Sequence, residues 1–179
     1  FWDDAVKGSS TLRAAALRRL KAETAELLGE TFAFALWDAE KFYDNIDLSL
    51  LFEAAISCGL PRRELILSMQ VLLAPREIKI GVVSGRAISP ANGMLAGLKR
   101  SNFFARLLLY KTLSALHVAV PAAGPRQYVD DLAQLVTGER TFVIDTAGLA
   151  AWMLYLALGK LKVKVSVKSA IVGSDIGVA

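Results

Sequence analysis

The chain has 179 residues, of which 54% are hydrophobic and 21% are charged, and its net charge is +4. This composition supplies enough apolar side chains for a substantial core and excludes an intrinsically disordered protein. The one cysteine, Cys58, excludes an internal disulfide and favours a reducing compartment. The modest positive charge permits a polyanionic partner but does not require one.

The ends of the sequence indicate a piece of a longer protein. The chain begins with Phe1 rather than Met, and residues 173–179 have the look of a chain cut in mid-course, so we interpret it as one domain or one large subdomain. We find no secretory signal, and the longest apolar stretch, Leu149–Leu158, is too short to span a bilayer. We therefore expect an intracellular protein, nuclear or cytoplasmic, with no membrane partner.

The first half of the chain alternates between helical and strand patterns. Residues 31–38 carry apolar side chains in both alternating sets, which is typical of a central strand covered on both faces. Helix-capping residues, glycines and prolines predict three helices, beginning at Ser10, Asp47 and Pro61 and ending near Gly29, Gly59 and Pro75. The first helix carries basic residues that form either a solvated face or a contact with nucleic-acid phosphates: Arg13, Arg18, Arg19 and Lys21.

The second half of the chain continues this alternation. We predict strands at 77–83 and 160–168, the latter from its strict alternation of apolar and basic residues. Apolar runs predict helices at 101–116 and 146–158, and between them residues 127–136 form a tight hairpin that turns at Asp130. This order of elements predicts an α+β fold in which an antiparallel sheet is backed by helices on one face.

Three acidic residues stand where strands end. Asp38 follows the predicted central strand, and Asp130 and Asp131 lie at the tip of the hairpin. An Asp-Asp pair often marks no more than a turn. However, two carboxylates about 4 Å apart repel by roughly 4 kcal/mol at an effective dielectric near 20, so a sheet edge that gathers them needs a cation. Hard oxygen ligands suit Mg²⁺, and two ions about 3.5–4 Å apart perform phosphoryl and nucleotidyl transfer.

Four motifs in order then produce a specific resemblance. Residues 128–131, Tyr-Val-Asp-Asp, resemble the Tyr-x-Asp-Asp signature of reverse transcriptases, and residues 38–46 resemble the first catalytic motif of retrotransposon polymerases. Residues 93–101 resemble the glycine-containing motif that opens the helix beside the template, and 164–169 resemble the Lys-containing motif after the catalytic hairpin. The resemblance covers about residues 31–169, the polymerase palm, and is nearest to non-LTR retrotransposon and group II intron enzymes.

The resemblance implies a role for each matching residue. Asp38 and Asp130 would be the main ligands of two Mg²⁺ ions, or of Mn²⁺, with Asp131 as a weaker ligand and the Ala39 carbonyl completing one site. Tyr43 would exclude a ribose 2′-hydroxyl, or would be a buried core aromatic. Lys168 would meet the triphosphate or protonate pyrophosphate, or would protect a sheet edge. The remaining residues expected at the substrate site are Ala96, Gly97, Ser101 and Tyr128.

The sequence also departs from the family pattern. Ala96 stands where the family has Gln, which removes a side-chain hydrogen bond near the nucleotide. A second candidate for the same motif, residues 84–90, has the family's Ser-Pro ending, but we prefer 93–101 because a long helix follows it. The basic fingers segment is not recognisable, and we see no thumb, endonuclease or RNase H segment.

We therefore expect an RNA-directed DNA polymerase, a nucleotidyltransferase derived from a retroelement. Its partners would be an RNA template, a DNA primer and a deoxynucleotide. Residues 1–30 would be a helical segment on the fingers side, 31–173 the palm and part of the fingers, and 174–179 a truncated tail. Two alternatives stay open: an RNA-dependent RNA polymerase with the same palm, and a decayed remnant that only binds nucleic acid. A fragment of this kind need not be active alone, and its oligomeric state is not predicted.

Overall fold

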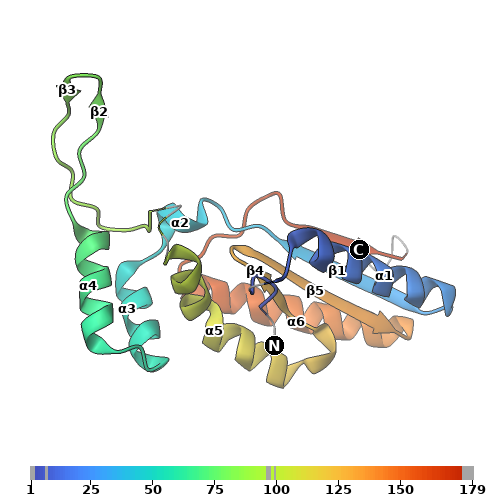
Figure 1. The fold of residues 1–179 in the computed structure, drawn as a ribbon. Helices are drawn as coiled ribbons and strands as arrows, with labels where there is room; N and C mark the ends of the chain where they lie inside the picture. The colour runs from blue at the N-terminus through green and yellow to red at the C-terminus, as the bar shows by residue number, and fades with distance from the viewer. Residues whose placement is uncertain (1–2, 7, 96–97, 99, 175–179) are drawn as a thin grey trace. The chain divides into compact units, whose positions relative to one another are not determined.

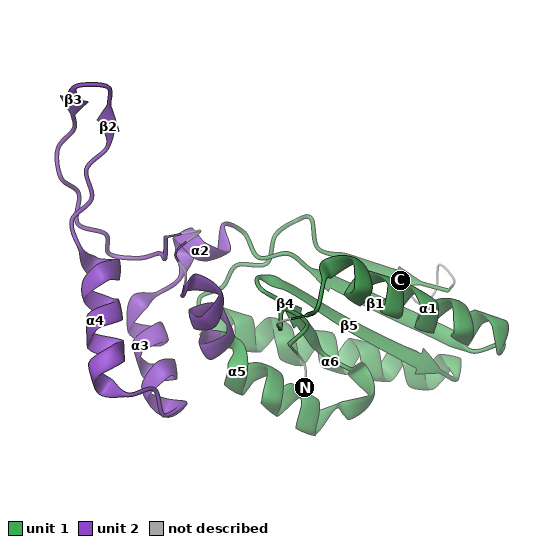
Figure 2. Ribbon diagram, in the orientation of Figure 1, with its two compact units in different colours: residues 1–40, 109–179 green, residues 41–108 purple. Residues whose placement is uncertain are grey.

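The structure, a computed structural model, describes residues 3–6, 8–95, 98 and 100–174, and it divides into two units. Figure 2 colours the first unit, residues 1–40 and 109–179, in green and the second, residues 41–108, in purple. The first unit contains the sheet and the three acidic residues, and it is the part of the chain on which the site depends.

The first unit is built around an antiparallel sheet. Among the described residues, four strands form it in the order β4 (Arg126–Tyr128), β5 (Asp131–Gly138), β1 (Thr31–Trp37) and β6 (Ala170–Gly173). The pairing of β1 with β5 runs from Thr31 opposite Gly138 to Trp37 opposite Leu132. The predicted central strand is therefore confirmed, as is the α+β class.

Helices lie against both faces of this sheet (Figure 1). One face packs on α6 (Arg140–Lys160): Trp37 Nε1 donates to Gln134 Oε1 at 2.9 Å, and Gln134 Nε2 donates to the Ala150 carbonyl at 3.2 Å. The other face lies under α1 (Thr11–Leu27). The sequence predicted helices on one face only, and this part of the prediction was wrong. The side of α1 that faces the sheet contains few large apolar residues, so the sequence does not show that α1 forms a second layer.

The remaining elements complete the two units. Helix α5 (Ser101–Ala119) begins in the second unit and ends in the first, where a short 3₁₀ turn (Pro121–Ala123) follows it. Besides the start of α5, the described part of the second unit contains three helices and a small hairpin: α2 (Phe42–Asn45), α3 (Leu48–Ser57), α4 (Arg62–Leu73), β2 (Lys79–Ile80) and β3 (Val83–Ser84).

The helix boundaries largely confirm the capping residues read from the sequence. Ser10 Oγ accepts from the Arg13 amide at 3.1 Å, and Asp47 Oδ1 accepts from the amides of Ser49 and Leu50. Helix α6 begins six residues before the predicted start, because Glu139 caps it by accepting from the amides of Thr141 and Phe142. Capping by a side chain thus fixes three of these helix starts.

Two predicted strands were wrong. Residues 77–83 do not form one strand but contain β2, the turn of a hairpin and the first residue of β3, since Gly81 has a φ of +60° that reverses the chain. Residues 160–168 are not a strand: α6 continues to Lys160, Lys162 adopts a φ of +58°, and only Val165 pairs, in an isolated bridge with Ala39. The strand expected there begins at Ala170 instead.

Helix α6 is the described helix whose length and composition would allow it to cross a membrane. The sequence prediction considered only its most apolar stretch and judged it too short. In this structure the helix packs on the sheet through Val143, Ala150, Leu154 and Leu158, while Trp152 and Tyr155 stack on its exposed side.

Candidate active site

The strand register brings two of the predicted catalytic carboxylates together. Because Trp37 pairs with Leu132, continuing the ladder by one residue places Asp38 opposite Asp131. Directly opposed residues of an antiparallel pair project from the same face, with Cβ atoms about 4.5–5.5 Å apart. Asp38 and Asp131 therefore share the face of the sheet that also lies under α1.

Asp130 lies at the tip of a strained hairpin. Tyr128 pairs with Asp131, so Val129 and Asp130 form a two-residue loop. Val129 has a φ of +61°, a conformation that a β-branched residue rarely adopts and that costs on the order of 1–3 kcal/mol. The buried Gln127 supports the turn, since its Nε2 donates to the Val129 carbonyl at 2.6 Å. The hairpin thus holds Asp130 on a fixed turn beside Asp131.

Two serines hold the backbone of Asp38. The Ser169 hydroxyl accepts from the Asp38 amide at 3.0 Å, and the Ser166 amide donates to the Asp38 carbonyl at 2.8 Å. In the adjoining bridge between Ala39 and Val165 the hydrogen bonds come from the flanking residues. The polar groups of Ala39 therefore point the other way along the ladder, toward the strand that carries Asp131.

The acidic residues interact electrostatically. Shielding of part of its carboxyl from water raises the pKa of Asp131 above its ordinary value; the charges of Asp130 and Asp38 raise this pKa further, and the Arg18 guanidinium lowers it. Within the described ranges, however, no three acidic, His or Cys side chains form a group already close enough to hold a metal ion. The three carboxylates are neighbours on one edge, and their oxygen donors suit a hard cation, but they are not a preassembled metal centre.

A cavity of about 330 Å³ opens beside these carboxylates. Asp38, Asp131, Tyr128 and Lys168 line it, and Arg18 of α1 lines its opposite side. Lys168 lies on the loop after α6, next to the Ser169 that holds Asp38. The two motifs that flank the sheet edge, residues 128–131 and 164–169, are therefore brought to the first motif's Asp38 within one unit.

The second unit brings other predicted site residues together. The Met94 amide donates to the Tyr43 carbonyl at 2.7 Å, and the Tyr43 hydroxyl donates to Asn102 Oδ1 at 2.9 Å. Gly93 has a φ of +88°, and a Cβ there would stand 2.8 Å from the Asp44 carbonyl oxygen, so only glycine fits. Residues 43–46 and 93–94 are thus in contact, which links the motif at 38–46 to the motif at 93–101.

Three further substrate-site predictions have different outcomes. Ser101 is buried, its hydroxyl donates to the Leu95 carbonyl at 2.6 Å, and α5 begins at that residue, as the choice of residues 93–101 required. The rival segment 84–90 instead belongs to the hairpin arm, where Ile88 pairs with Arg76. Ala96 and Gly97 lie outside the described residues.

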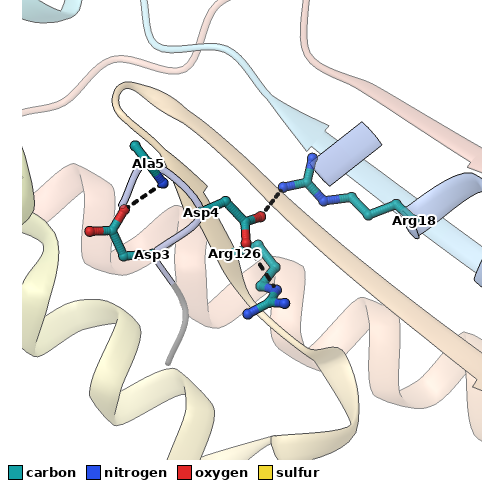
Figure 3. Close-up of polar contacts among 5 residues, drawn as sticks. All are labelled: Asp3, Asp4, Ala5, Arg18 and Arg126. Atoms are coloured by element: carbon teal, nitrogen blue, oxygen red, sulfur yellow. Dashed lines mark hydrogen bonds and ion pairs between the residues drawn. The ribbon is translucent and has the colours of Figure 1, made fainter. Parts of the chain in front are cut away.

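Sequence reasoning assigned no role to several residues that shape the site. Ser169 is the last residue of the motif at 164–169, and Gln127 directly precedes the motif at 128–131, so their places beside the motif residues were the available signal. Asp4 lay in a segment with no recognised pattern, yet its Oδ2 accepts from Arg18 Nη2 at 2.5 Å and its Oδ1 lies 3.6 Å from Arg126 Nε (Figure 3). The Asp4 amide also donates to the Gln127 carbonyl at 2.7 Å.

Comparison with known proteins gives a likeness in structure alone. No family model matches the chain, and no curated protein matches it. Among solved structures, it is similar to apo telomerase from Candida tropicalis truncated from its C-terminal domain (TM-score 0.67, 15% identity, 95% of this chain and 36% of that one). It is also similar to Candida tropicalis telomerase in complex with a TWJ fragment of telomeric RNA (TM-score 0.64, 15% identity, 95% and 30%). The chain spans about a third of the length of these proteins. Its fold is similar to that of one region of telomerase.

Proposed function

We propose that this chain is the palm of an RNA-directed DNA polymerase, which transfers a deoxynucleotide to a primer 3′-hydroxyl on an RNA template and releases pyrophosphate. The proposal rests on the strand register: extended by one residue beyond Trp37 and Leu132, it sets Asp38 opposite Asp131, with Asp130 on the adjoining turn, in a chain with a telomerase-like fold. One of the similar telomerases is in complex with RNA, which supports a nucleic-acid partner.

In this proposal Asp38, Asp130, Asp131 and the Ala39 carbonyl would hold two Mg²⁺ ions, with Mn²⁺ as a substitute. Such ions neutralise charge on the attacking and leaving oxygens of an in-line displacement. The raised pKa of Asp131 is consistent with a cation site, because partial burial first, and then the charges of Asp130 and Asp38, disfavour its ionised form, which a bound cation would stabilise. Since the acids are not preassembled, binding would draw them together.

The chain's other site residues would position the substrates. Lys168 lines the cavity beside Asp38 and would meet the triphosphate or protonate the leaving pyrophosphate. Tyr128 lines the same cavity and would contact the substrate, and Tyr43 would exclude a ribose 2′-hydroxyl. The remaining substrate contacts would come from the segment that opens α5: Ala96, Gly97 and Ser101.

The test is incorporation of one nucleotide into a labelled RNA-templated primer, with protein in excess, so that repeated cycling and strong template grip are not needed. We expect Mg²⁺-dependent addition of a deoxynucleotide, lost in Asp130→Asn, and a weaker preference for deoxynucleotides in Tyr43→Ala. A matched control is Asp145→Asn, which removes one exposed acid on α6.

Two other outcomes would replace the proposal. Addition of ribonucleotides alone would make this an RNA-dependent RNA polymerase with the same architecture. Binding of the template–primer with no addition, and with no difference between the wild type and Asp130→Asn in stabilisation by Mg²⁺, would make it a remnant that only binds nucleic acid.

A further inference from the structure

Helix α1 covers the face of the sheet on which the catalytic carboxylates lie. Along β1, side chains that face α6 alternate with side chains that face α1. The set that faces α1 includes Phe34 and Leu36, and Asp38, directly after the strand, continues it. The cavities between α1 and the sheet are lined by these same residues. Ala14, Ala15 and Arg18 form the α1 side of the cavity that contains Asp38 and Asp131. Asp38 is half-buried and Asp131 is exposed at the edge of this cavity, so α1 lies over the face that carries the acids without enclosing them.

The space under α1 is too small for the substrate that the proposed function requires. A cavity of about 330 Å³ lies at the lower end of the range for small-molecule pockets, which is about 300–1,000 Å³. It accommodates a ligand of roughly nucleotide size. A template–primer duplex, whose major groove alone is about 12 Å wide in B-form DNA, does not fit beneath the helix.

Helix α1 makes few apolar packing contacts with the sheet. The side turned to the sheet is a stripe of small residues around one arginine, and it consists of Ala14, Arg18, Ala22 and Ala25. The large apolar side chains of α1 point away instead, with Leu12 78% exposed and Leu27 88% exposed. An alanine methyl buries little area, on the order of 0.8 kcal/mol for each such group. The helix is held by few contacts of the kind that stabilise a core.

A polar clamp supplies the specific attachment. The Asp4 carboxylate accepts from Arg18 on α1 and lies next to Arg126 on β4 (Figure 3). The Asp4 amide donates to the carbonyl of Gln127, the residue that supports the turn carrying Asp130. The Asp4 and Arg18 side chains are only 12% and 18% exposed, so this pair is less screened than a surface ion pair. One carboxylate thus joins α1 to the hairpin.

We propose that α1 is a displaceable cover of the substrate-binding face, closed by the Asp4 clamp, which must swing away before a template–primer duplex reaches Asp38 and Asp131. This inference rests on the proposed function for the identity of what enters. A duplex that needs the open form binds with an apparent affinity reduced by the fraction of open molecules. A variant in which a larger fraction of molecules has α1 open should therefore bind the duplex more tightly, by the factor by which that fraction increases.

The test compares two near-isosteric variants of adjacent residues. Asp4→Asn weakens the clamp, whereas Asp3→Asn changes the net charge equally and keeps an oxygen for the Ala5 amide, which Asp3 Oδ1 accepts at 2.9 Å. Hydrogen exchange of the α1 amides is measured in each, with exchange of α6 as the reference for overall stability. We expect α1 to exchange about tenfold faster in Asp4→Asn than in Asp3→Asn, with α6 unchanged; tenfold corresponds to about 1.4 kcal/mol.

The second measurement is the affinity of each variant for a short RNA–DNA hybrid with a recessed DNA 3′ end. We expect about tenfold tighter binding to Asp4→Asn, and faster exchange of α1 in the wild type once the hybrid is bound. The inference is overturned if the two variants exchange alike, if faster exchange leaves the affinity unchanged, or if the hybrid protects α1. If α1 exchanges faster in Asp4→Asn as expected but neither variant nor the wild type binds the hybrid, the proposed function is wrong, and α1 does not control access of a duplex.

Discussion

Asp131→Asn should stabilise the metal-free protein at neutral pH. The register extended beyond Trp37 and Leu132 sets Asp131 opposite Asp38, a position at which Cβ atoms are about 5 Å apart. If the charges are separated by about the same distance, Coulomb's law gives about 0.8 kcal/mol in water and about 3 kcal/mol at an effective dielectric of 20. The site borders a solvent-accessible cavity, so the lower part of this range applies; Asp130 adds to the repulsion and Arg18 reduces it. We expect a net gain of about 1 kcal/mol, or about 2–4 °C in Tm.

The dependence on pH follows from the direction of the pKa shift. The folded-state pKa of Asp131 is raised above the ordinary value of 3.8, so the folded protein binds more protons than the unfolded chain between these two values. Ionised Asp131 lowers the free energy of unfolding. This loss of stability is absent below pH 3.8, grows as the pH rises through the folded-state pKa, and is complete at neutral pH. The stabilisation by Asp131→Asn should grow over the same window.

Thermal unfolding of wild type and Asp131→Asn in a chelator, from pH 3 to pH 8, measures this difference directly. Asp145→Asn on α6 serves as the charge-matched control and should show no comparable gain. A Tm that falls in Asp131→Asn at pH 7, or a difference that stays constant across the range, would refute the electrostatic coupling of the three acids.

Three other predictions concern the framework around the site. Val129→Gly should raise the free energy of unfolding by about 1 kcal/mol, measured in urea, because glycine accepts the φ of +61° but loses more unfolded-state entropy; a loss of stability would argue against strain in the turn. Gly93→Ala should cost at least about 2 kcal/mol in the same assay, since the new Cβ meets the Asp44 carbonyl at 2.8 Å, and an unchanged midpoint would show that this segment yields easily. The hydrogen bonds from Thr141 and Phe142 hold the pKa of Glu139 below its ordinary 4.5. The stability that the ionised cap contributes above pH 4.5 is therefore lost as the pH falls through the folded-state pKa. Glu139→Gln should flatten this part of the plot of Tm against pH, and an unaltered plot would contradict the cap.

The sequence was sufficient where local chemistry determines structure. Ser10 and Asp47 cap helices because their side-chain oxygens accept amides that the first turn leaves unpaired. The apolar run at residues 31–37 forms the central strand because both of its faces are covered. The neighbourhood of Asp38 and Asp131 also followed from the motifs, since strand ends and hairpin tips meet along one sheet edge.

The failures arose where tertiary contacts override a local pattern. The alternation at residues 160–168 predicted a strand, but α6 extends to Lys160 and Val167 is fully exposed, so the alternating valines do not share a buried face. The sheet-facing side of α1 could not be identified from hydrophobicity either, since it consists of alanines and one arginine while its leucines face solvent. The role of Asp4 depends on contacts that no local pattern encodes.

Titration with Mg²⁺ tests the central claim most directly. Tm is measured against metal concentration for wild type, Asp38→Asn, Asp130→Asn and the control Asp145→Asn. A divalent ion that binds the folded state alone raises the stability with its concentration, so we predict a rise in wild type and in Asp145→Asn and little or none in the two active-site variants. An identical response in all four proteins would mean that Asp38 and Asp130 do not bind a shared cation.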